Sequence, residues 1–112
     1  MAKVVLAPSA RNDLAEIKHY ISTELSNPSS AERVITSISK ELHDLQRFPE
    51  MGRMLDVKIG ADPYRYLVCG HYMAFYRVKD DTVHVDRILY GRRDYMALLF
   101  SVDKASEDIP EK

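Results

Sequence analysis

The spacing of apolar residues divides the chain into a helical first half and a strand-rich second half. Residues 3–7 (KVVLA) form a short β-type run, which ends at Pro8. The apolar positions that follow recur three or four residues apart: Leu14, Ile17, Ile21 and Leu25. This period predicts an amphipathic helix over residues 9 to about 25, with Ser9 as its N-cap.

A second amphipathic helix is predicted after Ser26-Asn27-Pro28. Ser29 and Glu32 have the spacing of a capping box, which marks the start of this helix. Its apolar stripe consists of Ile35, Ile38, Leu42 and Leu45. Phe48 continues the stripe, and Pro49 ends the helix. We expect the two helices to form an antiparallel hairpin, because the link between them is short.

Three strands are expected in the second half, over residues 64–68, 71–78 and 82–90. They are rich in aromatic and β-branched residues, and short turns separate them. The segment from Pro49 to Pro63 shows little pattern, so we interpret it as a turn followed by a loop. Apolar residues occupy both faces of the last strand, so alternation does not identify its buried side.

Helices early in the chain and hairpin-connected strands late in it predict an α+β domain. The helical pair would pack on one face of a small, mostly antiparallel sheet and leave the opposite face open. Residues 94–100 are interpreted as a short terminal helix with Met96, Leu99 and Phe100 as its apolar contacts. Residues 1–100 then form one domain, and residues 101–112, which lack an apolar period, form a flexible tail.

Composition agrees with one folded domain and limits the classes of function. The 112 residues are enough for one core but not for two, and 46% of them are hydrophobic. The net charge of −1 argues against a general nucleic-acid binder. Residues 64–95 carry six basic and four acidic side chains, so an anion site there depends on geometry more than on bulk charge.

Cysteine content and the absence of long apolar runs point to a cytoplasmic protein. The single cysteine, Cys69, excludes an intramolecular disulfide, and no His/Cys group has the spacing of metal ligands. We therefore expect neither a metal nor another cofactor. Residues 1–7 contain too short an apolar run for a signal peptide, and no stretch is long enough to span a bilayer.

The candidate chemistry lies at the end of the last predicted strand, where Gly91 precedes Arg92 and Arg93. Glycine permits close backbone approach, and arginine forks hold phosphates or carboxylates. Tyr90 and Tyr95 flank the arginine pair and supply flat apolar surfaces. Tyr90, Arg92 and Arg93 are therefore candidate binding residues, and the alternative for the arginines is an ordinary surface ion pair.

Arg87 and His71 each allow two interpretations. Arg87 lies in mid-strand between apolar residues, so it is either a buried, paired arginine or a further binding residue. His71 is the most plausible acid or base because histidine titrates near neutral pH. A water-exposed histidine at a hairpin is the alternative, which we favour.

Several short motifs occur in a defined order. They are Pro8-Ser9-Ala10 with Asp13-Leu14 and Ile17, Phe48-Pro49-x-x-Gly52-Arg53, Tyr64-Arg65, Gly70-x-Tyr72-x-x-Phe75-Tyr76-Arg77-Val78, and Val85-x-Arg87-Ile88-Leu89-x-Gly91-Arg92-Arg93-Asp94. No single motif is specific, but their order from Val4 to about Phe100 resembles the RelE/ParE superfamily of bacterial toxins from type II toxin-antitoxin pairs. The resemblance implies a β-α-α-β-β-β core, which agrees with the pattern described above.

The resemblance also implies a cognate antitoxin that binds and neutralises the chain, with a toxin–antitoxin hetero-oligomer as a possible form. The superfamily includes two chemistries. RelE-like members cut mRNA in the decoding site of the ribosome, whereas ParE-like members poison DNA gyrase and need no nuclease site. If this chain were a ribonuclease, its catalytic candidates would be Arg65, Arg93, Tyr95 and His71.

Individual residues favour the ParE-like branch. Met73 follows Tyr72 at the position where the RelE-like branch carries an arginine. Leu99 stands at the position of a late tyrosine, unless Tyr95 substitutes for it. Arg93 alone matches well. We therefore interpret the chain as a gyrase inhibitor; the alternatives are a RelE-like mRNA endoribonuclease and a degenerate member that only binds its antitoxin.

Overall fold

The computed structural model describes residues 1–59 and 62–91. The elements in these ranges are β1 (Lys3–Leu6), α1 (Pro8–His19), a π-helical turn η1 (Tyr20–Glu24), α2 (Pro28–Asp44), β2 (Arg53–Ile59), β3 (Asp62–Cys69), β4 (Tyr72–Lys79) and β5 (Thr82–Tyr90). None of the helices in these ranges has the length and apolar character needed to cross a membrane. The predicted terminal helix over residues 94–100 and the tail over 101–112 lie outside the described residues.

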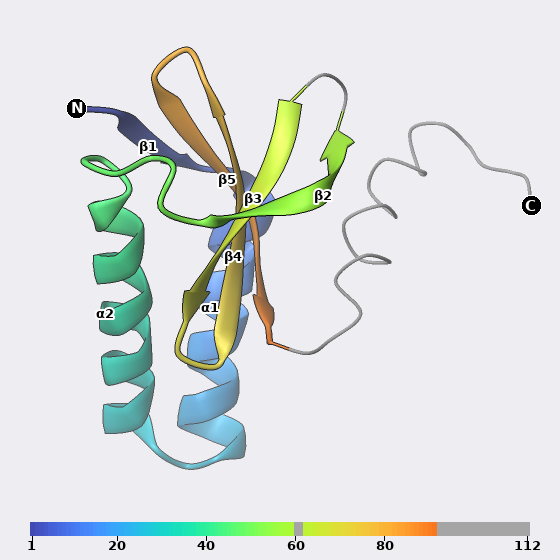
Figure 1. Ribbon diagram of the computed structural model, residues 1–112. Helices are drawn as coiled ribbons and strands as arrows, with labels where there is room; N and C mark the ends of the chain where they lie inside the picture. The colour runs from blue at the N-terminus through green and yellow to red at the C-terminus, as the bar shows by residue number, and fades with distance from the viewer. Residues whose placement is uncertain (60–61, 92–112) are drawn as a thin grey trace, which may run out of the picture.

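The strands form one five-stranded sheet in the order β1-β5-β4-β3-β2. Strands β2 to β5 form an antiparallel meander, and β1 joins it as a parallel neighbour of β5. Figure 1 shows α1 and α2 side by side, with α1 passing behind β4 and β5. The structure confirms the predicted α+β class, the helical hairpin and the mostly antiparallel sheet.

The main core lies between the hairpin and one face of the sheet. On the helical side it consists of Ala10, Ile38, Leu42 and Leu45. On the sheet side it consists of Leu67, Cys69, Ala74, Tyr76, Val83, Val85 and Ile88. Full burial of one large apolar side chain contributes roughly 1.5–3 kcal/mol, so these contacts hold the hairpin on the sheet.

The opposite face of the sheet is not open, contrary to the expectation from the sequence. Its buried residues are Tyr64, Phe75 and Leu89, with Leu55, Tyr66 and Met73 packed against them. The central strands are therefore apolar on both faces. This explains why alternation along the sequence did not identify one buried side.

Both helices begin before their predicted N-caps. The N-cap residue of α1 is Ala7, so Ser9 lies within the helix. The N-cap of α2 is Asn27, whose side chain accepts a hydrogen bond from the backbone N–H of Ser30 at 3.2 Å. Ser9 and Ser29 were therefore wrong assignments. In both helices a proline occupies the first turn, where its missing N–H has no partner to lose.

The first helix ends in the π-helical turn η1. The backbone N–H of Leu25 donates to the carbonyl of Tyr20 at 3.2 Å, which closes a turn of five residues instead of four. The wider turn changes the angular spacing of the side chains. Ile21 stays buried, but Leu25, which the period placed on the buried stripe, is 56% exposed.

Strand β2 lies in the segment that the sequence analysis assigned to a loop. It pairs antiparallel with β3 and adds an edge strand to the expected β-α-α-β-β-β core. The signal for it was present, because Leu55, Val57 and Ile59 recur at every second position. The long gap between recognised elements concealed this short alternation.

Candidate partner-binding site

A groove of about 940 Å³ lies where the helical hairpin meets the ends of β4 and β5. Its apolar wall consists of Ile17, Ile21, Leu25 and Val34 from the helical side and Tyr72, Ile88 and Leu89 from the strands. Asp13, Glu16, Ser30 and Arg87 supply the polar part of the lining. A groove between helices and strands with one apolar wall suits a segment of a partner protein.

Three tyrosines and a histidine lie along this groove. The rings of Tyr72 and Tyr90 make an edge-to-face contact at 5.5 Å, and the rings of His71 and Tyr90 lie 6.5 Å apart. Tyr20 and Tyr90 are 53% and 54% exposed. Burial raises the pKa of Tyr72, and the neighbouring Tyr90 and Tyr20 raise it further. The aromatic cluster thus offers flat, amphipathic surfaces of the kind that protein interfaces favour.

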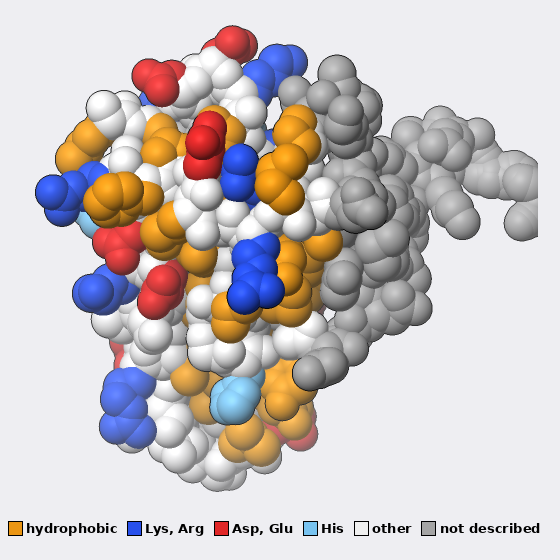
Figure 2. Space-filling model, viewed as in Figure 1, with side chains coloured by type: hydrophobic (Ala, Val, Ile, Leu, Met, Phe, Trp, Pro, Cys, Tyr) orange, Lys and Arg blue, Asp and Glu red, His pale blue; other side chains and the backbone are white. Residues whose placement is uncertain are grey.

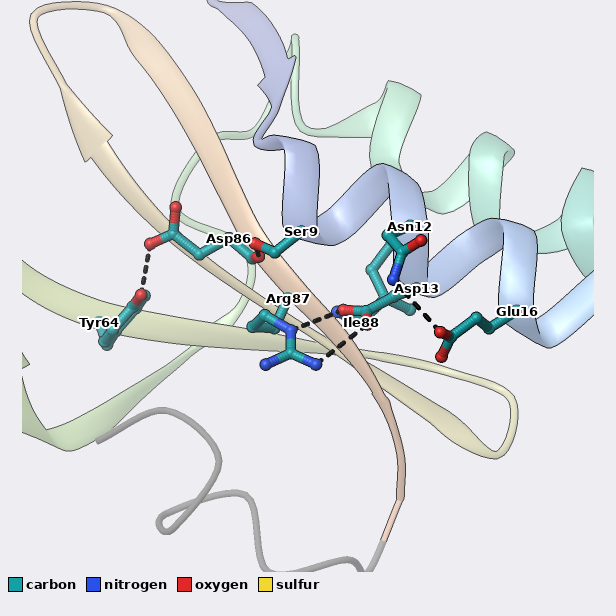
Figure 3. Close-up of polar contacts among 8 residues, drawn as sticks. All are labelled: Ser9, Asn12, Asp13, Glu16, Tyr64, Asp86, Arg87 and Ile88. Carbon is teal, nitrogen blue, oxygen red and sulfur yellow. Dashed lines mark hydrogen bonds and ion pairs between the residues drawn. The ribbon is translucent and has the colours of Figure 1, made fainter. Parts of the chain in front are cut away.

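Asp13 of α1 is bonded to β5 beside the groove (Figure 3). Arg87 donates to both carboxylate oxygens of Asp13, from Nε at 2.8 Å and from Nη2 at 3.0 Å. The backbone N–H of Ile88 donates to the same carboxylate at 2.9 Å. Asp13 is the one charged residue that is buried in the described part of the chain. Its hydrogen bond raises the pKa of Arg87, so the guanidinium stays charged.

The carboxylate of Asp86 is also occupied. It accepts hydrogen bonds from the hydroxyl of Tyr64 and from Nε of Arg77, the latter at 3.0 Å. The backbone carbonyl of Asp86 accepts a hydrogen bond from the hydroxyl of Ser9 at 2.8 Å (Figure 3). The Asp86 carboxylate is thus held by donors from two neighbouring strands, Tyr64 of β3 and Arg77 of β4.

A β-bulge at Asp86 sets the direction of the side chains that follow it. Val85 and Arg87 pair with consecutive residues of β4, so Asp86 between them has no pairing partner in the β4 ladder. The bulge shifts the alternation along β5 by one residue. Ile88 therefore continues the helix-facing row of the core.

The turn between α2 and β2 is held by polar bonds from the sheet. The backbone N–H of Gly52 donates to the hydroxyl of the buried Tyr76 at 2.9 Å. Nη1 of Arg65 donates to the carbonyls of Glu50 and Gly52 at 3.2 and 3.0 Å. A Cβ atom at Gly52 would lie 2.5 Å from the Tyr76 hydroxyl, so close packing requires glycine there. Close packing against Tyr76 thus explains the glycine in the motif Phe48-Pro49-x-x-Gly52-Arg53.

The structure places the sequence-predicted site residues in different surroundings. Arg65 is bonded to the turn between α2 and β2. Arg87 forms an ion pair with Asp13, in agreement with the interpretation of Arg87 as a paired arginine. His71 and Tyr90 lie together at the groove. Arg65 and His71 therefore occupy separate sites. The remaining candidates lie outside the described residues: Arg92, Arg93 and Tyr95.

Gly91 permits a close backbone approach, as the sequence indicated. Its N–H donates to the carbonyl of His71 at 2.7 Å, and a Cβ atom would lie 2.9 Å from that oxygen. The glycine therefore allows β5 to end against the turn between β3 and β4.

Sequence reasoning missed Asp13, Tyr20 and Leu25 as parts of this site. Asp13 belonged to a first-helix motif, but the motif did not reveal its partners, because Arg87 and Ile88 lie 74 and 75 positions away. Tyr20 and Leu25 are presented by η1, and no sequence signal for a π-helical turn was available. Only the helix–strand packing brings these residues together.

Basic side chains form no continuous patch on the face drawn in Figure 2. There the Lys and Arg side chains stand apart from one another, among hydrophobic and acidic ones. Nucleic-acid-binding domains typically cluster these residues on one face or along one helix.

Two toxin-antitoxin structures are among the solved structures that share the fold. The chromosomal ParDE toxin-antitoxin system from P. aeruginosa matches with a TM-score of 0.66 and 22% identity, over 82% of this chain and 98% of that chain. The toxin-antitoxin complex RelBE2 from Mycobacterium tuberculosis matches with a TM-score of 0.57 and 22% identity, over 80% of this chain and 96% of that chain. The fold is that of the RelE/ParE class of toxins.

A match to a protein-family model identifies the family within this class of toxins. The model described as the ParE toxin of the type II toxin-antitoxin system, parDE, matches residues 4–95. The chain therefore belongs to the ParE toxin family. No curated protein sequence matches the chain. Membership of a type II toxin family, predicted from the motifs, is confirmed, and the matching model is that of the ParE-like branch.

Proposed function

We propose that this toxin acts by binding a protein target, DNA gyrase, and that it does not cleave RNA. Cleavage of RNA through its 2′-OH requires a base, an acid and cations at the phosphate. Arg65 is engaged with the carbonyls of the turn after α2. Arg77 and Arg87 are engaged with carboxylates. The side chain of an arginine held in this way has a fixed direction, so it cannot turn freely toward a phosphate.

The environment of Met73 is the observation that carries the proposal. Met73 packs against the cluster of Tyr64, Phe75 and Leu89. An arginine at this position, as in the RelE-like branch, would place a cation among apolar side chains. Loss of one charge-stabilising donor typically reduces an enzymatic rate by about 10²–10³. The apolar surroundings of Met73 therefore support a toxin that does not cleave RNA.

We propose further that the cognate antitoxin covers the groove. Tyr20, Leu25 and Tyr90 are each more than half exposed there. Exposed apolar side chains gathered at one groove are typical of partner-binding sites. An amphipathic helix that places apolar residues three or four positions apart would match the apolar wall. The two toxin-antitoxin structures that share the fold support an antitoxin as the partner.

Glu16 suggests the charge pattern of that partner. Its side chain accepts a hydrogen bond only from the amide of Asn12 among the described residues, at 3.3 Å. Glu16 also lines the groove. We therefore expect a lysine or arginine of the antitoxin segment to lie opposite Glu16, with apolar residues opposite Leu25.

Two parallel assays test the target. Toxin freed from its antitoxin by denaturation and refolding is added to gyrase with relaxed plasmid, and separately to ribosomes with mRNA. We expect inhibition of supercoiling, reversal by added antitoxin, and intact mRNA. Cleaved mRNA with normal supercoiling would identify a RelE-like enzyme. A toxin that is inactive in both assays yet binds antitoxin would be a degenerate member.

A further inference from the structure

The outer edge of β5 is covered in its second half by side chains of α1 instead of a strand. β1 pairs with β5 only as far as Leu6 and Val85, and the backbone N–H of Ala7 then donates to the Val85 carbonyl at 2.9 Å. Beyond this point the hydroxyl of Ser9 donates to the carbonyl of Asp86. Further along, Asp13 accepts the N–H of Ile88. Polar side chains thus replace the missing strand, as edge strands require.

Among Ala7, Ser9 and Asp13, which cover this edge, Asp13 makes the most hydrogen bonds to β5. One carboxylate oxygen accepts both the Ile88 N–H and Nε of Arg87, and the other accepts Nη2 of Arg87. The Asp13 side chain is 7% exposed, so water cannot replace these bonds. The carboxylate therefore fixes the side chain of Arg87 and the backbone of Ile88 to α1.

Tyr90 follows two residues after Ile88. Its ring contacts Tyr72 and His71, and its side chain is 54% exposed beside the groove. The end of β5 is also fixed on its other side, where the N–H of Gly91 donates to the His71 carbonyl. The end of β5 is thus held in three ways: by its ladder with β4, in which Tyr90 pairs with Tyr72, by Asp13 of α1 on the opposite edge, and by the bond from Gly91 to the β3–β4 turn.

We propose that Asp13 is a positioning residue for partner binding: it fixes the end of β5 so that Tyr90 stands where the antitoxin segment contacts it. This inference rests on the proposed function of the groove. Asp13 acts through Tyr90 and need not itself touch the partner. Its role then differs from that of a residue that only stabilises the fold, because its effect on affinity requires the Tyr90 ring.

A double-mutant cycle on antitoxin affinity tests the role. Asp13→Asn keeps the shape of the side chain but removes the charge that holds Arg87, and we expect the folded variant to bind antitoxin about tenfold more weakly. Tyr90→Ala should weaken binding similarly. The double variant should bind no more weakly than Tyr90→Ala alone, because the ring through which Asp13 acts is already absent.

Matched controls keep the experiment decisive. Asp44→Asn makes the same chemical change outside the groove and is expected to leave affinity unchanged. If Asp13→Asn does not fold, Arg87→Gln takes its place in the cycle, since it removes the ion pair and keeps the bond from Ile88. The aromatic contact is followed independently by the NMR shifts of the Tyr90 ring, which should move in Asp13→Asn.

The outcomes separate this inference from the proposed groove. Equal and additive losses from Asp13→Asn and Tyr90→Ala would overturn the positioning role and leave the groove as the antitoxin site. Normal antitoxin binding by Tyr90→Ala would overturn the positioning role as well, and normal binding by both Tyr20→Ala and Leu25→Ala would remove the groove itself. None of these three outcomes depends on whether the target is gyrase.

Discussion

The hydroxyl of Tyr76 accepts a hydrogen bond from the backbone N–H of Gly52 at 2.9 Å, and both residues are buried. The contact joins the centre of β4 to the turn that leads from α2 into β2. Burial raises the pKa of the Tyr76 hydroxyl, although the bond from Gly52 and the nearby Arg65 lower it. The hydroxyl is therefore neutral and serves here as an acceptor for an N–H that water does not reach.

Substitution at either end of this contact should destabilise the protein. Tyr76→Phe leaves the Gly52 N–H without its acceptor, which is expected to cost about 1–3 kcal/mol of unfolding free energy. Gly52→Ala inserts a Cβ atom 2.5 Å from the hydroxyl and 2.7 Å from the Tyr66 carbonyl, with a similar expected loss of about 1–3 kcal/mol. Urea unfolding measures both.

The two losses should not add, because both variants disturb the same contact. The exposed Tyr90 provides the control, since Tyr90→Phe should change the unfolding free energy by less than about 0.5 kcal/mol. Full additivity in the double variant would show that the hydroxyl and the glycine contribute independently.

The groove can be tested with two residues of equal exposure. Leu25 and Val68 are 56% and 57% exposed, but only Leu25 lines the groove. Leu25→Ala is expected to weaken antitoxin binding about tenfold, whereas Val68→Ala should leave it unchanged, and neither should alter thermal stability strongly. Titration calorimetry with purified antitoxin measures the difference. Equal effects of the two substitutions would place the antitoxin elsewhere.

Arg93→Ala is expected to abolish toxicity while antitoxin binding and thermal stability stay nearly unchanged. The resemblance to both superfamily branches gives Arg93 a functional role, and an arginine that serves function and is not a buried structural partner usually contributes less than about 0.5 kcal/mol to folding. Growth after induced expression measures toxicity. Arg47→Ala, an exposed arginine after α2, is the control. A toxic Arg93→Ala variant would place the functional surface elsewhere, and an unfolded one would make Arg93 a structural residue.

The stability of the fold should decrease at alkaline pH because of Cys69. Burial, and then the neighbouring Glu41, raise the pKa of the Cys69 thiol from 9.0 to about 12. Above about pH 9 the unfolded chain loses a thiol proton that the folded chain keeps, so the free energy of unfolding falls as pH rises. Urea unfolding between pH 8 and 10 measures this slope.

Cys69→Ala should flatten that slope, and the folded wild-type protein should resist alkylation at pH 8 because its thiol stays protonated and buried. The raised pKa values of Tyr72 and Tyr76 add a further decrease at higher pH, which both proteins share. An identical slope in both proteins below pH 10 would exclude Cys69 as the cause.

The sequence by itself determined the order of most elements and the family. The three- and four-residue period of Ile38, Leu42 and Leu45 required one helical face to be buried, and these residues are buried. The turns at Gly70 and at Asp80-Asp81 separated the strands correctly, because positive φ angles favour these residue types. Local signals of this kind depend on near neighbours in the chain, and the sequence contains them in full.

The tertiary structure alone decided which residues form the groove and which arginines are occupied. Asp13 and Arg87 are 74 positions apart, and no local pattern pairs them. The bulge at Asp86 shifted the alternation of β5, so that no single period along this strand marks its buried side. The turn η1 moved Leu25 to the surface, although the helical period had placed it on the buried stripe. Long-range pairs, bulges and π-helical turns depend on how elements pack against one another, and that packing fixes the positions of Tyr20, Tyr72 and Tyr90 around the groove.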